Sequence, residues 1–483
     1  MKFKIISLIL LSAICICCTK TSSNNIENSQ DSTSVDAVSG LKTNAASTTY
    51  SELTTSNPGV LRIELQNLIN AAASKKQQLT LPAGKYVISD ELLLPSNANV
   101  CGTGDRTIIS LTSGNKTGRN VMRIVTRTND VKLTHLTLDA NQAANTGADL
   151  ASLVVTDNIN NLNFEYVTFL GGRDRGSVQI KGLNAYQVKN VTFYQCAFKE
   201  AGRTSLELRG TDKVLVKNCY FKNWGSQNPN SAAIQLQSQD NNNVQIIDNK
   251  FNNTFGKQFA IECAAAYVND GVIADNDLLD PNNLGGNGIS GYFKRTRITR
   301  NVLSGGNGNQ RSGLEIFGQS NTVDYNEIEA GCIAISPGIN EPGLSIVIDH
   351  NKVKTRGANV GGIQIGAGCC PISGVTVSNN VIDTRLSSGN SSGVVVGTYG
   401  RSQIVSNITV EANTIYTNAH SIRLQSLPGS KDIFLLRNSC KAGFTWLGVI
   451  TNTFTNVKAI GNINETDNKN VSYGVVMTPI IVL

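Results

Sequence analysis

The sequence predicts an all-β fold, a single-stranded right-handed parallel β-helix (a solenoid) with an N-terminal capping helix. The first observation is a repeated phrase, in which an alternating apolar strand ends in asparagine and another apolar residue follows two positions on. Its copies recur roughly every 25 to 30 residues, a period typical of stacked-repeat architectures. The second is a further apolar strand in every repeat, and the third is a composition of 44 glycines against 10 prolines. The repeated asparagines are Asn249, Asn276, Asn301, Asn326, Asn351, Asn380, Asn413, Asn438 and Asn462.

The repeated position explains why such coils would stack. A strand of one coil can bury only one face, so each coil needs neighbours to close a core. Asparagine tolerates the left-handed backbone conformation at a turn, and its amide can bond to the same amide one coil away. We therefore expect an asparagine ladder along the solenoid. In the earlier coils the same position holds Cys219, Cys196, Val167 and Leu136.

The first 56 residues predict export and a tether. Residues 1–18 contain two lysines, an apolar run and a cluster of cysteines, which indicate a signal peptide too short to span a membrane. The cysteine cluster resembles a bacterial lipoprotein cleavage box, with Cys18 as the lipidated residue. We expect an exported bacterial lipoprotein of the outer membrane, periplasm or cell surface, held by its lipid anchor alone; a plain secretory signal is the alternative. Residues 19–56 are rich in Ser, Thr and Asn and predict a flexible tether. The β-helix domain is then residues 57–483.

Residues 60–73 predict the capping helix, because their apolar residues have amphipathic spacing. A helix there would cover the open end of the solenoid, which otherwise exposes unpaired strand edges. The order of this helix, LTLPAGKY, LLLPSNANVCGTG and HLTLD resembles the amino-terminal part of pectate-lyase-like β-helix proteins. The apolar final segment, GVVMTPIIVL, is expected to cover the other end.

Charge and cysteine content limit the partners. The net charge of +7 is compatible with an anionic partner. Nucleic acid is not expected, because the basic residues are scattered and no aromatic stacking module is present. No CxxC or Cys/His spacing suggests a metal site. Cys196 and Cys219 share the ladder position on adjacent coils, where we expect a stack of buried thiols; a disulfide is the alternative.

The second strand of each coil predicts a long polar face. Alternation along these strands places the aliphatic residues inward and the polar residues outward. Such a face could bind a linear polymer along its length. One outward column is Gln179, Glu207, Gln235, Glu262, Ser290, Glu315, Ala334 and Gln364, and the next is Lys181, Arg209, Gln237, Ala264, Tyr292, Phe317 and Ser336.

Lys181 and Arg209 are the first catalytic candidates. Their Cα atoms should lie about 4.8 Å apart on consecutive coils. Repulsion between stacked cations lowers the pKa of the lysine and favours a neutral amine that can act as a base. Eliminative cleavage of a uronate polymer needs such a base, together with a cation that holds the sugar carboxylate.

These residues resemble the chondroitinase B and alginate lyase family of polysaccharide lyases. The local match is a strand ending in Lys181, then NVTFYQC ending at Cys196, then LELR ending at Arg209. The resemblance implies β-elimination of an anionic, uronate-containing extracellular polysaccharide, with Lys181 as base and Arg209 at the leaving-group side. Glu207 lies between them in the same site. In the alternative interpretation, Lys181 and Arg209 are solvated ladder residues paired with Glu207.

The metal requirement implied by that family is left open. Its calcium ligands would be carboxylates just before the lysine, and the segment GGRDRGSVQIK offers only Asp174. Calcium is therefore a candidate cofactor without a ligand set. Arg173 and Arg175 could instead neutralise the substrate carboxylate.

A glycoside hydrolase is the rival enzyme. Glu207, Glu262 and Glu315 lie on alternate coils, about 10 Å apart, whereas inverting glycosidases separate their two carboxyl groups by roughly 6.5–9.5 Å. The alternative is a ladder that keeps like charges off adjacent coils. A third hypothesis is a non-catalytic glycan-binding or surface structural protein. The remaining substrate-binding candidates are Gln235, Gln237, Tyr292, Lys294 and Arg295. The basic run beside Tyr292 could bind sulfate or carboxylate groups or could equally be a solvated edge; it consists of Lys294, Arg295, Arg297 and Arg300.

Overall fold

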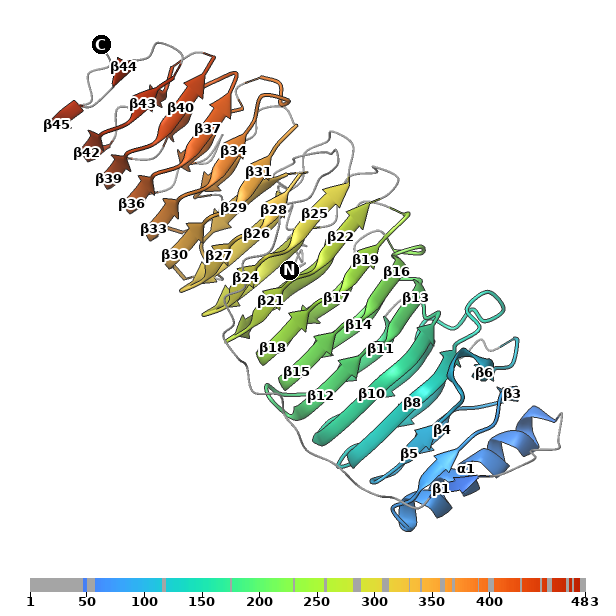
Figure 1. The fold of residues 1–483 in the computed structure, drawn as a ribbon. Helices are drawn as coiled ribbons and strands as arrows, with labels where there is room; N and C mark the ends of the chain where they lie inside the picture. The colour runs from blue at the N-terminus through green and yellow to red at the C-terminus, as the bar shows by residue number, and fades with distance from the viewer. Residues whose placement is uncertain are drawn as a thin grey trace, which may run out of the picture.

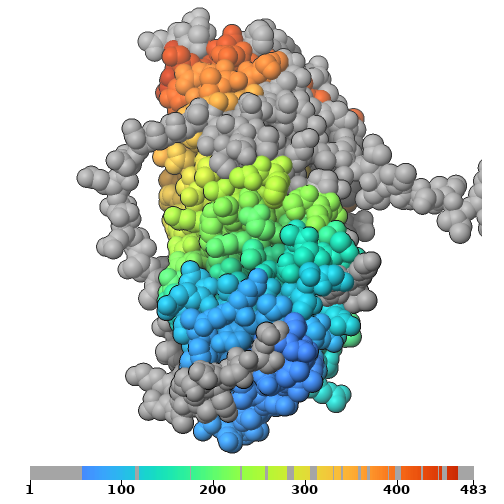
Figure 2. All heavy atoms as spheres, turned by 90° about the vertical axis from the view of Figure 1, so that its right-hand side faces the viewer, coloured from blue at the N-terminus to red at the C-terminus, as the bar shows by residue number. Residues whose placement is uncertain are grey.

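The computed structural model is a column of coils stacked in chain order, which confirms the predicted parallel β-helix (Figure 1). Strand pairing is parallel throughout except at the carboxyl-terminal end. The space-filling view shows the same order along the column, from the helical end to the last coils (Figure 2). The structure describes residues 47–49, 57–114, 119–173, 176–228, 231–255, 259–280, 288–305, 312–329, 331–338, 341–356, 361–366, 370–389, 391–397, 404–425, 428–443, 445–449, 454–465, 469–470 and 473–477.

The described strands form three faces of the column, because each strand pairs with its counterpart one coil later. Two long strands, β8 and β10, run from the first face into the second, and β20 runs from the third into the first. The first face is β2(Gln78–Thr80), β5(Asn99–Cys101), β8(Asn129–Asp139), β10(Ile159–Leu170), β12(Val188–Tyr194), β15(Thr211–Lys217), β18(Asn241–Ile247), β21(Val272–Ala274), β24(Arg297–Thr299), β27(Thr322–Asp324), β30(Gly343–Asp349), β33(Ile372–Ser378), β36(Val405–Glu411), β39(Lys431–Leu436) and β42(Thr455–Ile460).

In the coils that contain a ladder asparagine, the strand of the second face comes directly after that asparagine in the sequence, and the strand of the third face completes the coil. The second is β3(Gly84–Ile88), β6(Thr107–Leu111), β13(Ala197–Ala201), β16(Tyr220–Trp224), β19(Lys250–Asn252), β22(Asp277–Asp280), β25(Val302–Gly305), β28(Glu327–Ile328), β31(Lys352–Lys354), β34(Val381–Asp383), β37(Thr414–Thr417), β40(Ser439–Ala442) and β43(Ile463–Asn464), with the ends of β8 and β10. The third is β4(Leu92–Leu94), β7(Asn120–Ile124), β9(Ala151–Val155), β11(Gly176–Lys181), β14(Thr204–Arg209), β17(Ala232–Gln237), β20(Phe259–Asn269), β23(Ile289–Lys294), β26(Ser312–Gln319), β29(Cys332–Ser336), β32(Ile363–Ile365), β35(Val394–Gly397), β38(Ile422–Gln425) and β41(Leu447–Val449).

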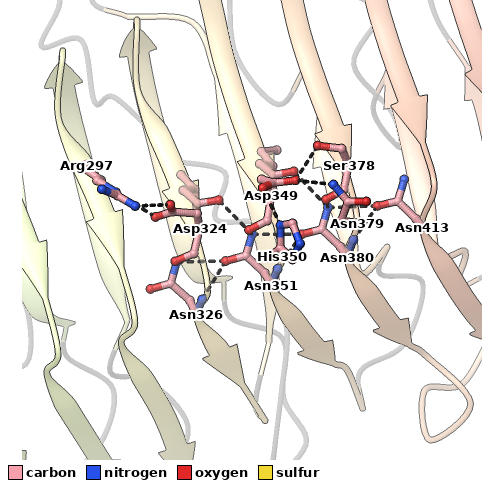
Figure 3. Close-up of polar contacts among 12 residues, drawn as sticks. Arg297, Asp324, Asn326, Asp349, His350, Asn351, Ser378, Asn379, Asn380 and Asn413 are labelled. Atoms are coloured by element: carbon pink, nitrogen blue, oxygen red, sulfur yellow. Dashed lines mark hydrogen bonds and ion pairs between the residues drawn. The ribbon is translucent and has the colours of Figure 1, made fainter. Parts of the chain in front are cut away.

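The asparagine ladder forms as predicted. The Asn351 backbone N–H and Nδ2 both donate to Asn380 Oδ1, at 2.8 and 3.0 Å, and Asn351 Oδ1 accepts the same pair of bonds from Asn326 (Figure 3). Asn351 Nδ2 also donates to the Val323 carbonyl at 2.8 Å. Every polar group of this buried side chain is therefore satisfied, as burial requires.

The left-handed conformation lies one residue earlier than predicted. The residues immediately before the ladder asparagines have positive φ, between +51° and +57° at Asp275, Arg300, Tyr325 and His350. The turn before each ladder asparagine is thus made by a residue whose type differs from coil to coil. The asparagine is selected for its amide hydrogen bonds, because its side chain points into the stack.

The cysteines at the ladder position are free thiols, in agreement with the predicted thiol stack. Cys196 Sγ and Cys219 Sγ donate to the carbonyls of Phe164 and Phe193 at 3.3 and 3.4 Å. These bonds replace the amide-to-carbonyl bond that each ladder asparagine makes one coil back. Burial raises the pKa of the Cys219 thiol well above its ordinary value, so it remains a neutral donor.

The helical end of the column is closed by α1(Pro58–Ser74), which confirms the predicted capping helix. Asn57 caps it, with Oδ1 accepting from the Gly59 N–H, and Pro58 occupies the first turn, where its missing N–H costs nothing. Leu65 and Ile69 are buried against the first coil. The single-turn η1(Gly104–Arg106) lies in an early coil.

Each end of the solenoid carries added strands. β1(Ser47–Thr49) pairs in parallel with β2, so strand pairing begins inside the range predicted as tether. At the carboxyl-terminal end, β44(Lys469–Asn470) and β45(Tyr473–Met477) pair antiparallel with β43 and β42. The predicted leader, its lipidation site Cys18 and residues 478–483 lie outside the described part of the chain. Within that part, no helix has the length and hydropathy needed to cross a membrane.

Candidate active site

The third face carries the predicted polar column in the predicted register. Glu207 pairs with Gln235, Gln235 with Glu262, Glu262 with Ser290, and Ser290 with Glu315. Gln179 precedes them, and Ala334 and Gln364 follow. Alternation along each strand thus places one polar side chain of every coil above the next, with aliphatic side chains beneath them.

Burial along this column is uneven, and it distinguishes the glutamates. Glu207 is only 3% exposed, and Gln179 is fully buried. Glu262 and Glu315 are half-buried, so they have both a desolvated environment and access to solvent. A ligand in solution can therefore reach Glu262 and Glu315 more readily than Glu207.

Glu207 is committed to its neighbours. Arg209 Nη2 donates to Glu207 Oε1 at 2.8 Å, and Gln237 Nε2 donates to the same oxygen at 2.9 Å. Lys181 lies opposite Arg209 in the strand register, as predicted. The carboxylate of Glu207 offsets part of the repulsion that two stacked cations would exert on each other.

Glu262 sits in a chain of polar contacts. Thr204 Oγ1 donates to Gln235 Oε1 at 3.1 Å, and Gln235 Nε2 donates to Glu262 Oε2 at 3.0 Å. Burial raises the pKa of Glu262 above its ordinary value, while the hydrogen bond from Gln235 and the charge of Arg203 oppose that rise. Both opposing groups favour the ionised form of Glu262.

Glu315 has a different balance of neighbours. Ser290 Oγ donates to Glu315 Oε2 at 2.9 Å. Burial raises the pKa of Glu315, this hydrogen bond lowers it, and the charge of Glu262 raises it further. Burial therefore raises the pKa of both carboxyl groups, and a nearby arginine opposes that rise at Glu262, whereas a nearby carboxylate adds to it at Glu315.

Aromatic rings lie beside these carboxyl groups. Tyr292 and Phe317 follow Ser290 and Glu315 by two residues on the same side of their strands, and their ring centroids are 5.0 Å apart. Tyr267 meets the Tyr292 ring edge-on at 5.8 Å. Lys294 Nζ lies 4.0 Å from the Tyr267 ring centroid and forms an ion pair with Glu341 at 2.9 Å.

A bulge in β20 produces this aromatic group and corrects the predicted second column. Cys263 pairs with Gly291 and Val268 with Phe293, so β20 has extra residues between them. Ala264 therefore does not lie opposite Tyr292, as the alternating pattern predicts. The bulge instead brings Tyr267, 8% exposed, to the Tyr292 ring. Sequence reasoning missed Tyr267, and the only signal was the added length of the segment CAAAYVN.

The other predicted binding residues are dispersed. Arg173 Nη1 donates to the Asn145 carbonyl at 3.2 Å. Arg295 forms a two-bond ion pair with Asp270, at 2.7 and 2.8 Å, away from the carboxyl groups. Arg297 and Arg300 are paired in the same way with Asp324 and Asp275, which matches the solvated-edge interpretation of the basic run. Arg175 and Asp174 lie outside the described residues.

Buried polar atoms without a protein partner occur at the β11–β14 end of the face. They are Ser177 Oγ, Gln179 Oε1 and Ser205 Oγ. Buried polar atoms nearly always have a hydrogen-bond partner, so these three atoms are exceptions within the fold. Among the described residues, no three His, Cys, Asp or Glu side chains lie together as a metal site. Asp174, the one carboxylate that the sequence offers as a calcium ligand before Lys181, lies outside that part of the chain.

Comparison with known proteins gives similarity of fold only. No protein-family model matches the sequence, and no curated protein matches it. The A-module of the mannuronan C-5 epimerase AlgE6 of Azotobacter vinelandii is 16% identical over 83% of this chain and 94% of its own, with a TM-score of 0.35. The Agl-KA catalytic domain is 12% identical over 80% and 65%, with a TM-score of 0.43. The catalytic domain of a GH87 α-1,3-glucanase is 12% identical over 91% and 71%, with a TM-score of 0.37.

Proposed function

We propose that the protein is a polysaccharide-processing enzyme that hydrolyses glycosidic bonds at Glu262 and Glu315. The observation that carries this proposal is the pair itself, two half-buried carboxyl groups in one register column, each with its pKa raised by burial. Glycoside hydrolysis needs two such groups, one protonated and one ionised.

The two environments assign the roles. Glu315, whose pKa is raised by burial and by the charge of Glu262, is the general acid that protonates the glycosidic oxygen. Glu262, beside Arg203 and Gln235, is the base that takes a proton from the attacking water. Two coils separate their Cα atoms by about 10 Å, close to the roughly 6.5–9.5 Å between carboxyl groups in inverting enzymes. We therefore propose inversion at the anomeric carbon.

The surroundings favour a sugar substrate. A sugar ring presents apolar C–H groups on its faces and hydroxyl groups at its edge. Tyr292 and Phe317 offer ring surface beside the acids. The half-buried amide of Gln237, on the same face, can bond to sugar hydroxyls.

Polysaccharide lyase activity at Lys181 and Arg209 is the second candidate, and one observation favours it. The strand register places the two side chains on consecutive coils of the same face, the arrangement that the chondroitinase B and alginate lyase resemblance implies. A uronate substrate and a contribution from Glu207 belong to this candidate. We rank it second because Arg209 is already engaged by the buried Glu207.

The proposal also includes the export of the protein and its lipid anchor. We infer from residues 1–18 that the protein is carried out of the cytoplasm and anchored through Cys18, so its substrate would be extracellular. Metabolic labelling with a radioactive fatty acid tests this. Label in the wild type and none in Cys18→Ser is expected, and equal label in both would contradict the anchor.

The deciding experiment measures two products in the same reactions. The protein is mixed with neutral and uronate-containing polysaccharides, and new reducing ends and the ultraviolet absorbance of unsaturated uronate ends are followed together. We expect reducing ends without absorbance, reduced about 10²- to 10⁴-fold in Glu315→Gln and in Glu262→Gln. Glu165→Gln, a half-buried glutamate on the first face paired with Lys132, is the matched control and should retain activity.

The same data separate the alternatives. If the wild type produced ultraviolet absorbance and Lys181→Ala did not, the reaction would be elimination and the proposal of hydrolysis would be wrong. If no polymer gave a product, and circular dichroism showed that all variants were folded, the remaining hypothesis would be a non-catalytic binding or structural protein.

A further inference from the structure

A groove on the second face is separate from the candidate active site. It crosses β28, β31, β34 and β37, which lie side by side in the later half of the column (Figure 1). Its volume is about 180 Å³. Its lining includes Glu329, Lys354, Val381, Asp383, Arg385 and Tyr416.

The groove has an acidic floor and a basic rim. The side chains of Glu329 and Asp383 are 14% and 17% exposed, whereas those of Lys354 and Arg385 are 47% and 49% exposed. Glu327 and Lys352 add one further charge of each sign. The three carboxylates and three cations balance, so the groove as a whole does not favour a ligand of either charge.

Two of the ion pairs are open. Lys352 Nζ is 3.9 Å from Glu327 Oε2, and Lys354 Nζ is 4.0 Å from Glu329 Oε1. Both distances exceed that of a hydrogen bond. A hydroxyl group is both donor and acceptor, so it could donate to the carboxylate and accept from the ammonium group of either pair.

The third ion pair is closed and fixes one end of the groove. Arg385 Nη2 and Nε donate to the two oxygens of Asp383 at 2.7 and 2.9 Å. Burial alone would raise the pKa of Asp383, but the hydrogen bonds from Arg385 hold it below its ordinary value. The same guanidinium lies 4.7 Å from the Tyr416 ring centroid. These contacts give the groove one rigid wall.

An apolar surface lies among these charges. Val381 is 44% exposed and occupies the coil between Lys352 and Thr414 in the register. An apolar patch flanked by hydroxyl-binding pairs matches a sugar ring, whose faces are apolar and whose edge carries hydroxyl groups. The volume is below the roughly 300–1,000 Å³ of sites that enclose a drug-sized ligand, which suits one ring of a longer chain.

We propose that this groove is a second, non-catalytic binding site for a neutral polysaccharide chain. The balanced charge of the groove favours a neutral ligand, the open ion pairs favour a ligand with hydroxyl groups, and the exposed Val381 favours one with an apolar face. The site does not depend on Glu262 or Glu315, so it can exist whether or not the protein hydrolyses its ligand. In an enzyme, two sites on one polymer would raise the local substrate concentration at the active face.

The test uses the full-length protein in a Glu262→Gln/Glu315→Gln background, so that the probe is not consumed. Binding is measured by native electrophoresis through gels that contain a neutral glucan, mannan or xylan, and by calorimetry with the matching hexasaccharides. We expect retardation in at least one neutral polymer and an affinity at least about tenfold lower in Val381→Glu. Lys354→Met, which removes one bridging ammonium, should weaken binding severalfold.

A matched variant controls for added surface charge. Val347 on β30 is 39% exposed and lies outside the groove, so Val347→Glu should bind as the parent does. Equal retardation of Val381→Glu and the parent would overturn the proposal, as would binding of uronate polymers only. The two proposals can fail separately. If Val381→Glu lost binding and the wild type hydrolysed no polymer, the binding groove would be supported and the proposed active site would be wrong.

Discussion

At the scale of single residues, Glu262 and Glu315 are half-buried, and each accepts a hydrogen bond from a neutral side chain. Their oxygens accept from an amide and a hydroxyl group, which satisfy a carboxyl in either protonation state. Glu207, by contrast, is paired with Arg209 at 2.8 Å. The carboxyl groups of this face thus differ in whether a charged or a neutral side chain donates to them.

The raised pKa of Glu315 predicts a pH-dependent cost to stability. A carboxyl whose pKa is higher in the folded than in the unfolded protein is uncharged in both states at low pH, and folding then costs nothing. As pH rises through the folded pKa, the buried group must ionise, and stability is lost. Glu315→Gln should therefore unfold at a higher temperature than wild type at about pH 8, and the gain should disappear near pH 4.

Thermal unfolding of both proteins from about pH 4 to pH 8 measures this difference. Glu165→Gln is again the control, because Glu165 is paired with Lys132 and its replacement should give no such gain at high pH. A Glu315→Gln protein that is less stable than wild type at every pH would contradict the assigned desolvation.

At the scale of elements, the asparagine ladder joins every coil to the next from Cys219 to Asn462. Asn351→Ala removes the acceptor of two bonds from Asn326 and the donor to the Val323 carbonyl. Unpaired buried groups cost about 1–3 kcal/mol each. We expect Asn351→Ala to lower the free energy of unfolding by about 2–5 kcal/mol.

Urea unfolding, followed by circular dichroism, measures that loss. Asn160→Ala, on the exposed side of β10, is the control and should change stability by about 0.5 kcal/mol at most. If the two variants lost equal stability, the ladder would contribute nothing special to coil stacking.

The elements also show how far sequence reasoning reached. The asparagine ladder, the α1 cap and the register from Gln179 to Gln364 were all predictable, because they follow from periodicity and burial. The left-handed residue was placed one position too late, because asparagine tolerates that conformation without requiring it. The bulge before Val268 was not predictable, since its length becomes visible only against the neighbouring strands. The pKa shifts of Glu262 and Glu315 depend on tertiary burial and could not be read from sequence.

At the scale of the whole molecule, stability is a sum over neighbouring coils. A coil in the middle, such as the one that contains Ile298, has a neighbour on each side, whereas the terminal coils have a coil on one side only. Hydrogen exchange should therefore show the strongest amide protection in the central coils and weaker protection toward α1 and β42. In Asn351→Ala the added exchange should be confined to β27, β30 and β33. Uniform protection along the column would instead indicate a single cooperative unit.

The coil repeat also sets a fixed unit of distance on the active face. Carboxyl groups placed one coil apart would be about 4.8 Å apart at the backbone, near the roughly 5–5.5 Å of glycosidases that retain anomeric configuration. Placed two coils apart, as Glu262 and Glu315 are, they approach the inverting separation. In a solenoid of this kind, gaining or losing a single coil between two carboxyl groups would thus change their separation by one fixed step.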